Sequence, residues 1–245
     1  MLLRVDNVSI SFGGARILSD VSFNVGASGV KGLIGPNGAG KTSLFNIITG
    51  FYRADAGEIS LSGGNLTRLR PHVVVRKGVA RTFQKPSLAW DLTVFENVLL
   101  GSMNNRGLGL VVRRSRLKEW TEECLRMCGI PPERWQEPMG RAGVLLVKKV
   151  EFARAASLSP TLILLDEICS GLSHDETDEV LDLIRDYGDR NRCGVLFVEH
   201  DLRAVQKICR DVVVLDFGVV IYDGDIRGAF SDRRVVEAYI GGPDA

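Results

Sequence analysis

The sequence lacks any apolar run that approaches the roughly 20 residues needed for a helix to span a bilayer. Its first residues, MLLRVDNVS, are too few and too soon charged for a signal peptide. We therefore expect a chain that carries neither a membrane span nor a cleaved leader.

An excess of one charge is also missing. The 245 residues contain 31 basic and 30 acidic side chains, for a formal net charge of +1. A general nucleic-acid binder usually shows a basic excess, so nucleic acid is not an expected partner. The composition, 45% hydrophobic and 25% charged, excludes the disordered class, and the length suits one large domain or two tightly joined subdomains.

Paired cysteines with the spacing of metal ligands are missing as well. The chain has five cysteines, at positions 124, 128, 169, 193 and 209. Cys124 and Cys128 could share one face of a helix, but no second pair is spaced to complete a metal site. An odd number of cysteines without a pairing pattern predicts reduced thiols, as in the cytosol.

What the sequence does contain is a series of short strand patterns. The first, LLRVDNVSISF, alternates like a half-buried strand, and the glycines at 13–14 mark a hairpin turn before a second strand at 22–25. Buried apolar strands follow at 162–166, 194–200 and 211–224, with a helical pattern between the first two. Buried strands that alternate with helices predict a mainly parallel sheet, so we expect an α/β fold.

The middle of the chain has a different pattern. Residues 86–158 carry charged helical segments such as RRSRLKEWTEECLRMCG and no convincing strand. We therefore expect a helical subdomain at 86–158, inserted into an α/β core with a β subdomain that is formed by residues 1–85 and 159–245.

The strongest motif is a glycine-rich loop between an apolar strand, VKGLIG, and a helical pattern, SLFNIITG. Its residues are Gly35, Pro36, Asn37, Gly38, Ala39, Gly40, Lys41 and Thr42, a complete G-x-x-x-x-G-K-T. Glycines let successive backbone N–H groups converge on phosphate oxygens, and the helix N-terminus adds partial positive charge. Lys41 would neutralise the β- and γ-phosphates, and the Thr42 hydroxyl would bind Mg²⁺. The flanking strand and helix favour nucleotide binding over a chance glycine turn.

A second motif, LILLDE, ends in two adjacent acids, Asp166 and Glu167. In a doubly wound sheet, such a strand delivers its acids beside the phosphate loop. There Asp166 would hold Mg²⁺, directly or through water, and Glu167 could orient or deprotonate the water that attacks the γ-phosphate. Without the phosphate loop, two solvated acids at a strand end would be the better interpretation.

With GPNGAGKTS, LILLDE and the later VEHD at 198–201, the chain resembles an ABC-type ATPase, and more closely the ATP-binding subunits of branched-chain amino acid and urea/amide importers. The supporting stretches are SFGGARILSDVSF, SLFNIITGFYRADAGEI, RKGVARTFQ, LTVFENVLLG and VVEAYIGG. The resemblance implies a P-loop NTPase fold of the ABC ATPase type, with a RecA-like core, an N-terminal antiparallel β subdomain and an inserted helical subdomain. It also implies ATP and Mg²⁺ as ligands, and ATP hydrolysis coupled to solute uptake.

The resemblance also implies roles for single residues. Phe12 falls where the family stacks an aromatic ring on adenine, and Ser43 belongs to the nucleotide-binding set. Gln84, in RTFQ, matches the glutamine that reaches Mg²⁺ and the water and senses the permease, while His200 matches the histidine that contacts the γ-phosphate. Without the family, Phe12 would be a core residue, Gln84 a surface residue and His200 a structural one. The implied catalytic residues are Glu167, His200 and Gln84, and the implied metal ligands are Thr42, Gln84 and Asp166.

A place in a membrane complex is implied as well. The partners would be integral-membrane permease subunits and a second ATPase subunit, with a solute-binding protein as an indirect partner, at the cytoplasmic face of the inner or plasma membrane. The segment after Gln84, KPSLAWDLTVFENV, lies where such ATPases dock a helix of the permease. Its Trp90 and Phe95 could equally belong to the core of the helical subdomain.

One family motif is degenerate. The signature, LSGGQ in the family, falls on residues 142–146, where Gly143 takes the place of the serine and Leu145 that of the key glycine. In the family, these two groups bind the γ-phosphate of the ATP held by the opposite subunit. We therefore hypothesise that this chain pairs with a different ATPase whose signature is intact. Ile168 and Ser173 also depart from the family, near the expected dimer contact.

Two alternative functions stay open. The first is a urea/amide importer ATPase in place of an amino acid importer ATPase. The second is a regulatory subunit that binds nucleotide and hydrolyses little because of its signature. The retained Glu167 and His200 argue against the second alternative, since a subunit without hydrolysis has no chemical need for both.

Overall fold

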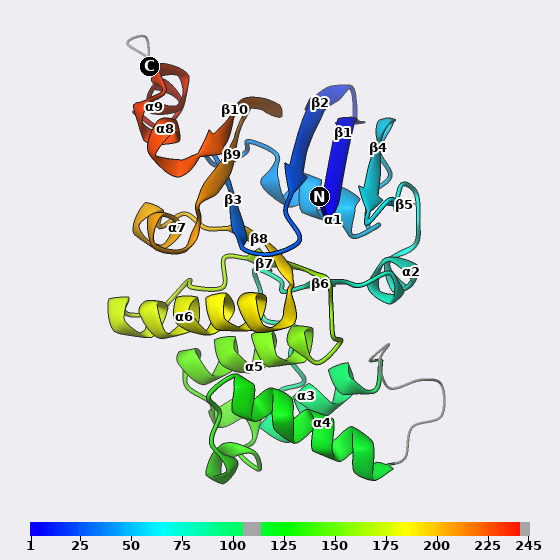
Figure 1. The fold of residues 1–245 in the computed structure, drawn as a ribbon, viewed down its shortest axis with the longest axis vertical. Helices are drawn as coiled ribbons and strands as arrows, with labels where there is room; N and C mark the ends of the chain where they lie inside the picture. The colour runs from blue at the N-terminus through cyan, green and yellow to red at the C-terminus, as the bar shows by residue number, and fades with distance from the viewer. Residues whose placement is uncertain (105–113, 241–245) are drawn as a thin grey trace.

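The structure is a computed structural model that describes residues 1–104 and 114–240 (Figure 1). Its strands are β1 (Leu3–Phe12), β2 (Ala15–Val25), β3 (Val30–Ile34), β4 (Ala56–Leu61), β5 (Gly64–Asn65), β6 (Val79–Arg81), β7 (Leu162–Asp166), β8 (Gly194–Val198), β9 (Asp211–Asp216) and β10 (Val219–Asp225). Its helices are α1 (Lys41–Ile48), α2 (Pro71–Arg76), α3 (Val94–Ser102), α4 (Arg114–Met127), α5 (Val144–Ala156), α6 (His174–Asn191), α7 (Leu202–Ile208), α8 (Ile226–Ser231) and α9 (Arg233–Ile240). The predicted α/β class is confirmed.

The smaller sheet, ordered β2-β1-β4-β5, is antiparallel. The turn between β1 and β2 contains Gly13 and Gly14, whose φ angles of 55° and 85° favour glycine. Apolar residues of this sheet form one buried cluster with Leu44, Phe45 and Ile48 of α1. The helix that follows the glycine-rich loop is therefore anchored between the two sheets.

The larger sheet, ordered β10-β9-β3-β8-β7-β6, is parallel except for the edge strand β10. Every residue of β7 and β8 is buried, as their continuous apolar runs predict. Lys31 of β3 reaches the sheet edge, where its ammonium forms an ion pair with Asp223 of β10. The carboxyl ends of the parallel strands all lie at one end of the sheet. Open α/β sheets bind ligands just beyond these carboxyl ends.

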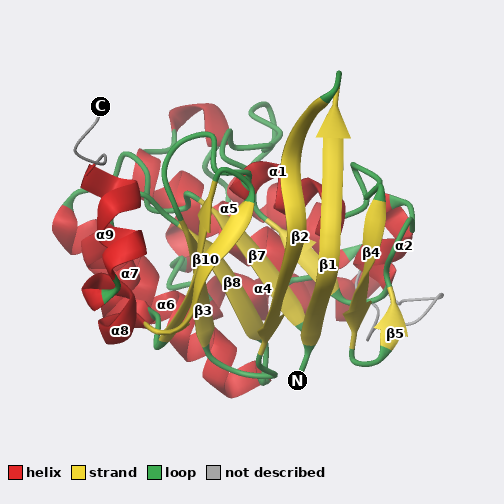
Figure 2. Ribbon diagram, turned by 90° about the horizontal axis from the view of Figure 1, so that it is seen from above, coloured by secondary structure: helices red, strands yellow, loops and turns green. Residues whose placement is uncertain are grey.

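The two sheets meet along β2 and β10, which lie beside each other in Figure 2. Helices α3, α4 and α5 form a separate group at the lower end of the molecule in Figure 1. The predicted charged helix is α4, and α3 begins at a capping box between Thr93 and Glu96. In the described part of 86–158, the β pairing is limited to one isolated bridge, Thr93 to Pro138.

Among the described residues, no helix is both long and apolar enough to cross a membrane. The five cysteines are all buried and free. Burial raises the pKa of the Cys128 thiol to about 12, so this group stays protonated at neutral pH.

Candidate active site

The glycine-rich loop connects β3 to α1, and its backbone requires glycine at two positions. At Gly35, φ is 148° and an added Cβ would lie 2.0 Å from the carbonyl oxygen of Leu215. At Gly40, φ is 103° and an added Cβ would lie 2.6 Å from Cδ2 of Leu18. At Gly35 a side chain would clash with backbone, and at Gly40 it would have to displace Leu18 and adopt a φ that side chains rarely adopt, so both positions favour glycine.

Lys41, the first residue of α1, lies against the loop. Its Nζ donates hydrogen bonds to the carbonyl oxygens of Gly35 (2.7 Å) and Pro36 (2.9 Å), and the residue is 7% exposed. Burial lowers the pKa of Lys41, while the negative charges of Glu167 and Asp166 oppose that shift. The ammonium is therefore held at the loop, where phosphate oxygens could replace the two carbonyls.

A cavity of about 250 Å³ opens beside the loop, and we call it the loop cavity. Its lining consists of Ile17, Asn37, Gly38, Ala39, Gly40, Lys41, Thr42, Ser43, Gln84, Glu167 and His200. The fold thus brings the loop together with three side chains that are distant in sequence. Of the other residues predicted for the site, Phe12, Gly35, Pro36 and Asp166 do not line this cavity.

The carboxylate of Glu167 is held on both oxygens. Nε2 of Gln84 donates to its Oε2 at 3.0 Å, and Nε2 of His200 lies 2.7 Å from its Oε1. Glu167 itself has φ of 51°, and its backbone N–H donates to the carbonyl oxygen of Val198 at 2.9 Å. Gln84, Glu167 and His200 each follow one of three neighbouring strands, β6, β7 and β8, so the order of the strands brings them together.

Asp166, the last residue of β7, is 3% exposed and does not line the loop cavity. Its Oδ2 accepts a hydrogen bond from Nη2 of Arg81 at 2.8 Å, and its backbone N–H donates to Oγ1 of Thr82 at 3.1 Å. Asp166 therefore has an internal cationic partner, which sequence reasoning did not predict.

Two residues that sequence reasoning missed support these acids. Arg81 belongs to the stretch RKGVARTFQ, three positions before Gln84. This closeness to a predicted site residue could have marked Arg81 as a candidate. Lys148 of α5 is buried, and its Nζ donates to the carbonyl oxygen of Glu167 at 3.3 Å and to Oγ of Ser170 at 3.1 Å. Lys148 follows the signature segment 142–146 by two residues, but no sequence pattern indicated that its side chain would reach Glu167, 19 positions further along the chain.

Comparison with known proteins decides the class of this site. The family model described as ABC transporter matches residues 18–170, which include the glycine-rich loop and the Asp166–Glu167 pair. The chain belongs to the ABC transporter family. It is an ATPase of that family, and the predicted P-loop NTPase fold of the ABC ATPase type is confirmed.

Several relatives match this ABC ATPase over nearly its whole length. BraF of Pseudomonas aeruginosa, a high-affinity branched-chain amino acid transport ATP-binding protein, is 32% identical, with 98% of each chain covered. LivG of Salmonella typhimurium, of the same description, is 31% identical with 98% of each chain covered. LptB of Haemophilus influenzae, a lipopolysaccharide export system ATP-binding protein, is 30% identical, with 98% of this chain and 97% of LptB covered.

Solved structures agree with the fold. A nucleotide-free ATP-binding cassette from an ABC transporter superimposes with a TM-score of 0.85 at 27% identity, covering 98% of this chain and 99% of the other. The ADP conformation of an ATP-binding cassette superimposes with a TM-score of 0.85 at 28% identity, covering 98% of both chains.

Phe12 of this ABC ATPase lies apart from the loop cavity. It ends β1, is 46% exposed, and contacts Tyr52 edge to face with the ring centroids 5.1 Å apart. Ile17, on the strand that follows, lines the cavity instead. The role of Phe12 toward adenine stays a prediction.

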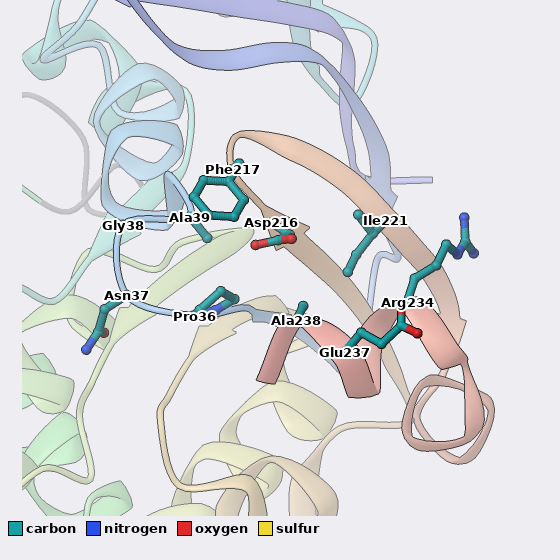
Figure 3. A pocket seen from close by; sticks show the side chains of 10 residues that line it. All are labelled: Pro36, Asn37, Gly38, Ala39, Asp216, Phe217, Ile221, Arg234, Glu237 and Ala238. Carbon is teal, nitrogen blue, oxygen red and sulfur yellow. The ribbon is translucent and has the colours of Figure 1, made fainter. Parts of the chain in front are cut away.

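A second cavity, of about 580 Å³, also borders the loop (Figure 3). It is bounded by the loop residues Pro36, Asn37, Gly38 and Ala39, by Asp216, Phe217 and Ile221, and by Arg234, Glu237 and Ala238 of α9. Asn37, Gly38 and Ala39 also line the loop cavity, so this part of the loop is a wall shared by both cavities.

The degenerate signature lies at the start of α5 and outside the loop cavity. Gly143 is the N-cap of this helix and offers no side chain to the cap. Leu145 packs against the hydrophobic core, so its side chain serves the packing of the helix. Of the other departures, Ile168 is buried, and Ser173 forms a capping box with Glu176 at the start of α6.

Proposed function

We propose that this ABC ATPase binds and hydrolyses ATP to power an importer of branched-chain or other hydrophobic amino acids. The observation that carries the hydrolytic step is the carboxylate of Glu167, which lies in the loop cavity between Gln84 and His200. The similarity to BraF and LivG supports amino acid import. Urea and short amides are the alternative solutes, and the comparable similarity to LptB makes the direction of transport a matter for experiment.

In the proposed reaction, the backbone N–H groups of the loop, with Lys41 and Thr42, bind the phosphates of ATP. Glu167 accepts a hydrogen bond from a water molecule and takes its proton as the water oxygen forms a bond to the γ-phosphorus. The bond from this phosphorus to the β–γ bridging oxygen breaks, and its electron pair leaves with ADP. Gln84 and His200 restrict the orientation of the Glu167 carboxylate.

The residues at the loop cavity fit Mg²⁺ held jointly with phosphate oxygens. Among the described residues, no group of His, Cys, Asp or Glu side chains is placed to bind a metal ion by itself. The cavity offers the hydroxyl of Thr42 and the amide oxygen of Gln84, which are hard donors of the type that Mg²⁺ prefers. Thr42, Gln84 and Asp166 would hold the ion, Asp166 directly or through water. Bound Mg²⁺ would neutralise charge that develops on the phosphates.

The partners of this proposal are permease subunits in the membrane, a solute-binding protein that acts through them, and a second ATPase subunit. The chain would then work at the cytoplasmic face of the inner or plasma membrane. Because Gly143 offers no hydroxyl, we infer that the second ATPase is a different chain whose signature completes the site at Lys41, Glu167 and His200. ATPase activity that rises well above that of the isolated chain on mixing with a cognate partner would support this.

The direct test is the steady-state ATPase activity of the purified chain. Glu167→Gln is expected to lower kcat at least about 100-fold, which is the contribution of a positioned base, while ATP affinity stays close to that of the wild type. Glu119→Gln, a change on the exposed face of α4, is the matched control and should leave the rate unchanged. Equal rates for wild type and Glu167→Gln would contradict the assigned base.

The solute needs a separate experiment. The chain would be reconstituted in vesicles with its cognate permeases and binding protein, and ATP-driven uptake of leucine would be compared with uptake of urea. Uptake of leucine with no uptake of urea supports the amino acid importer, and the reverse result supports the alternative. Transport out of the vesicles in an ATP-dependent manner would contradict both.

A second candidate function is favoured by the Gly143 cap: a regulatory subunit that binds ATP and hydrolyses it poorly. Gly143→Ser tests this, since it adds a hydroxyl while changing helix stability by only a few tenths of a kcal/mol. A large rise in ATPase activity of the isolated chain would identify the missing hydroxyl as the cause of weak hydrolysis. Tight ATP binding with no activity in either form, alone or with partner, would favour the regulatory function.

A further inference from the structure

Arg81 links two parts of the molecule that the mechanism treats separately. It ends β6, and its side chain is 6% exposed, beside an Asp166 side chain that is 3% exposed. Its Nη2 donates to Oδ2 of Asp166 at 2.8 Å, and its Nη1 donates to Oδ1 of Asn46 in α1 at 2.7 Å. One planar guanidinium therefore ties the acid at the end of β7 to the helix that follows the phosphate loop.

The guanidinium also lies against two aromatic rings. Its central carbon lies 5.3 Å from the ring centroid of Phe45 and 5.0 Å from that of Phe83. Phe45 belongs to α1, and Phe83 immediately precedes Gln84. These contacts restrict the orientation of the guanidinium plane. They therefore also restrict the direction in which Nη2 donates to Asp166.

Nε of Arg81 stands apart from this network. It is buried, and it has no hydrogen-bond partner among the residues that the structure describes. Arg81 also lines a cavity of about 440 Å³ with residues of α2, α3 and α5, including Arg76, Leu100, Glu151 and Arg154. A buried donor without an acceptor costs free energy, and a buried ion pair can often be replaced by apolar side chains without loss of stability. Stability alone therefore does not explain a buried ion pair that leaves Nε of Arg81 without an acceptor.

We propose that Arg81 is a positioning residue that fixes the carboxylate of Asp166 relative to α1, so that the acid supports Mg²⁺ at the nucleotide. This inference rests on the proposed function for its site and adds a residue to it. Arg81 bonds one carboxylate oxygen of Asp166 and bonds α1 at the same time. A lysine at this position carries all of its N–H groups on one nitrogen, so it lacks the two separate nitrogens of the planar fork that reach these two acceptors.

The test is the gain in ATP affinity that Mg²⁺ confers, measured by titration calorimetry with and without Mg²⁺. All variants carry Glu167→Gln, so no turnover is needed. Arg81→Lys keeps the positive charge and loses the planar fork. In Arg81→Lys, we expect the factor by which Mg²⁺ increases ATP affinity to fall by about tenfold, because one charge-assisted contact is misdirected. ATP affinity measured without Mg²⁺ should stay within about twofold of the parent. Arg76→Gln, in the same cavity but on the exposed face of α2, should behave like the parent.

A second variant covers the case in which Arg81→Lys does not fold. Asn46→Leu removes the partner of Nη1 and leaves the ion pair with Asp166 in place, and it should lower the Mg²⁺-dependent gain in the same direction. Parent-like gain in a folded Arg81→Lys, or in Asn46→Leu if the former does not fold, would overturn the proposal. An equal loss in Arg76→Gln would also overturn it, because the effect would then come from charge in the cavity. A wild-type chain without ATPase activity, both alone and with its cognate partner ATPase, would refute the proposed function and leave this binding test intact.

Discussion

Glu151 provides a quantitative test of how burial sets the energetics of this fold. It lies on α5, it is 4% exposed, and it lines the same cavity as Arg81. Burial raises its pKa from an ordinary value of 4.5 to about 7, against the opposing effects of the charges of Lys148 and Arg154 and of a hydrogen bond from the backbone of Ser87.

The pKa of Glu151 is higher in the folded chain than in the unfolded chain, so the folded chain binds the proton more tightly. Its contribution to stability is fully present below about pH 4.5 and is lost as the pH rises through about 7. A pKa difference of one corresponds to about 1.4 kcal/mol, so the loss amounts to about 3 kcal/mol by pH 8. Glu151→Gln keeps the shape of the side chain and removes the titration. We expect it to match the wild type in acid and to be more stable by about 3 kcal/mol near pH 8.

The assay is urea unfolding followed by circular dichroism at a series of pH values between about 5 and 8. Glu199 is also buried with a raised pKa, so only the difference between wild type and Glu151→Gln isolates Glu151. For a chain of this length, 3 kcal/mol corresponds to about 6 to 12 °C in the thermal midpoint. The exposed Glu133→Gln serves as the control. A stability difference that stays constant with pH, or that shrinks as the pH rises, would refute the reasoning.

Further predictions concern the loop and the hairpin beside it. Lys41→Met removes the cation of the loop and should weaken ATP binding by about 10- to 100-fold in calorimetry, without loss of folding. Gly35→Ala places a methyl group against the Leu215 carbonyl and should prevent normal folding, whereas Gly29→Ala, with φ of 84° but open space around it, should cost only about 1 kcal/mol in thermal unfolding. Phe217 is 87% exposed with φ of 40°, so Phe217→Asn should raise stability by up to about 1 kcal/mol.

The parts of the fold and site that could be predicted are those that depend on residues adjacent in the sequence. The glycine-rich loop lies between a strand and a helix as the pattern requires, because turn geometry and helix start are local properties. β7 and β8 were predictable because a strand buried on both faces shows as an unbroken apolar run. The class of the active site followed from the same contiguous motifs.

Other elements could not be predicted, for physical reasons that differ. β2 begins at Ala15, whereas the sequence indicated a strand only at 22–25, because shifts in the pairing with β1 interrupt the alternation of apolar residues. β6 has three residues, too few for a pattern. The pairs Arg81–Asp166 and Lys31–Asp223 join residues 85 and 192 positions apart, so no local signal connects them.

The cluster around Glu167 shows what strand order adds to sequence motifs. Gln84 is 83 positions before Glu167, and His200 is 33 positions after it, yet both contact its carboxylate. They meet because β6, β7 and β8 are parallel neighbours in the sheet. Residues just past the carboxyl ends of these strands therefore lie close together at one end of the sheet. Arg81 at the end of β6 and Asp166 at the end of β7 are paired because the same two strands are neighbours; Arg81 lies three residues before Gln84, and Asp166 lies one residue before Glu167. The strand order therefore places two layers of side chains at this end of the sheet, a buried layer with Arg81 and Asp166 and an outer layer with Gln84 and Glu167.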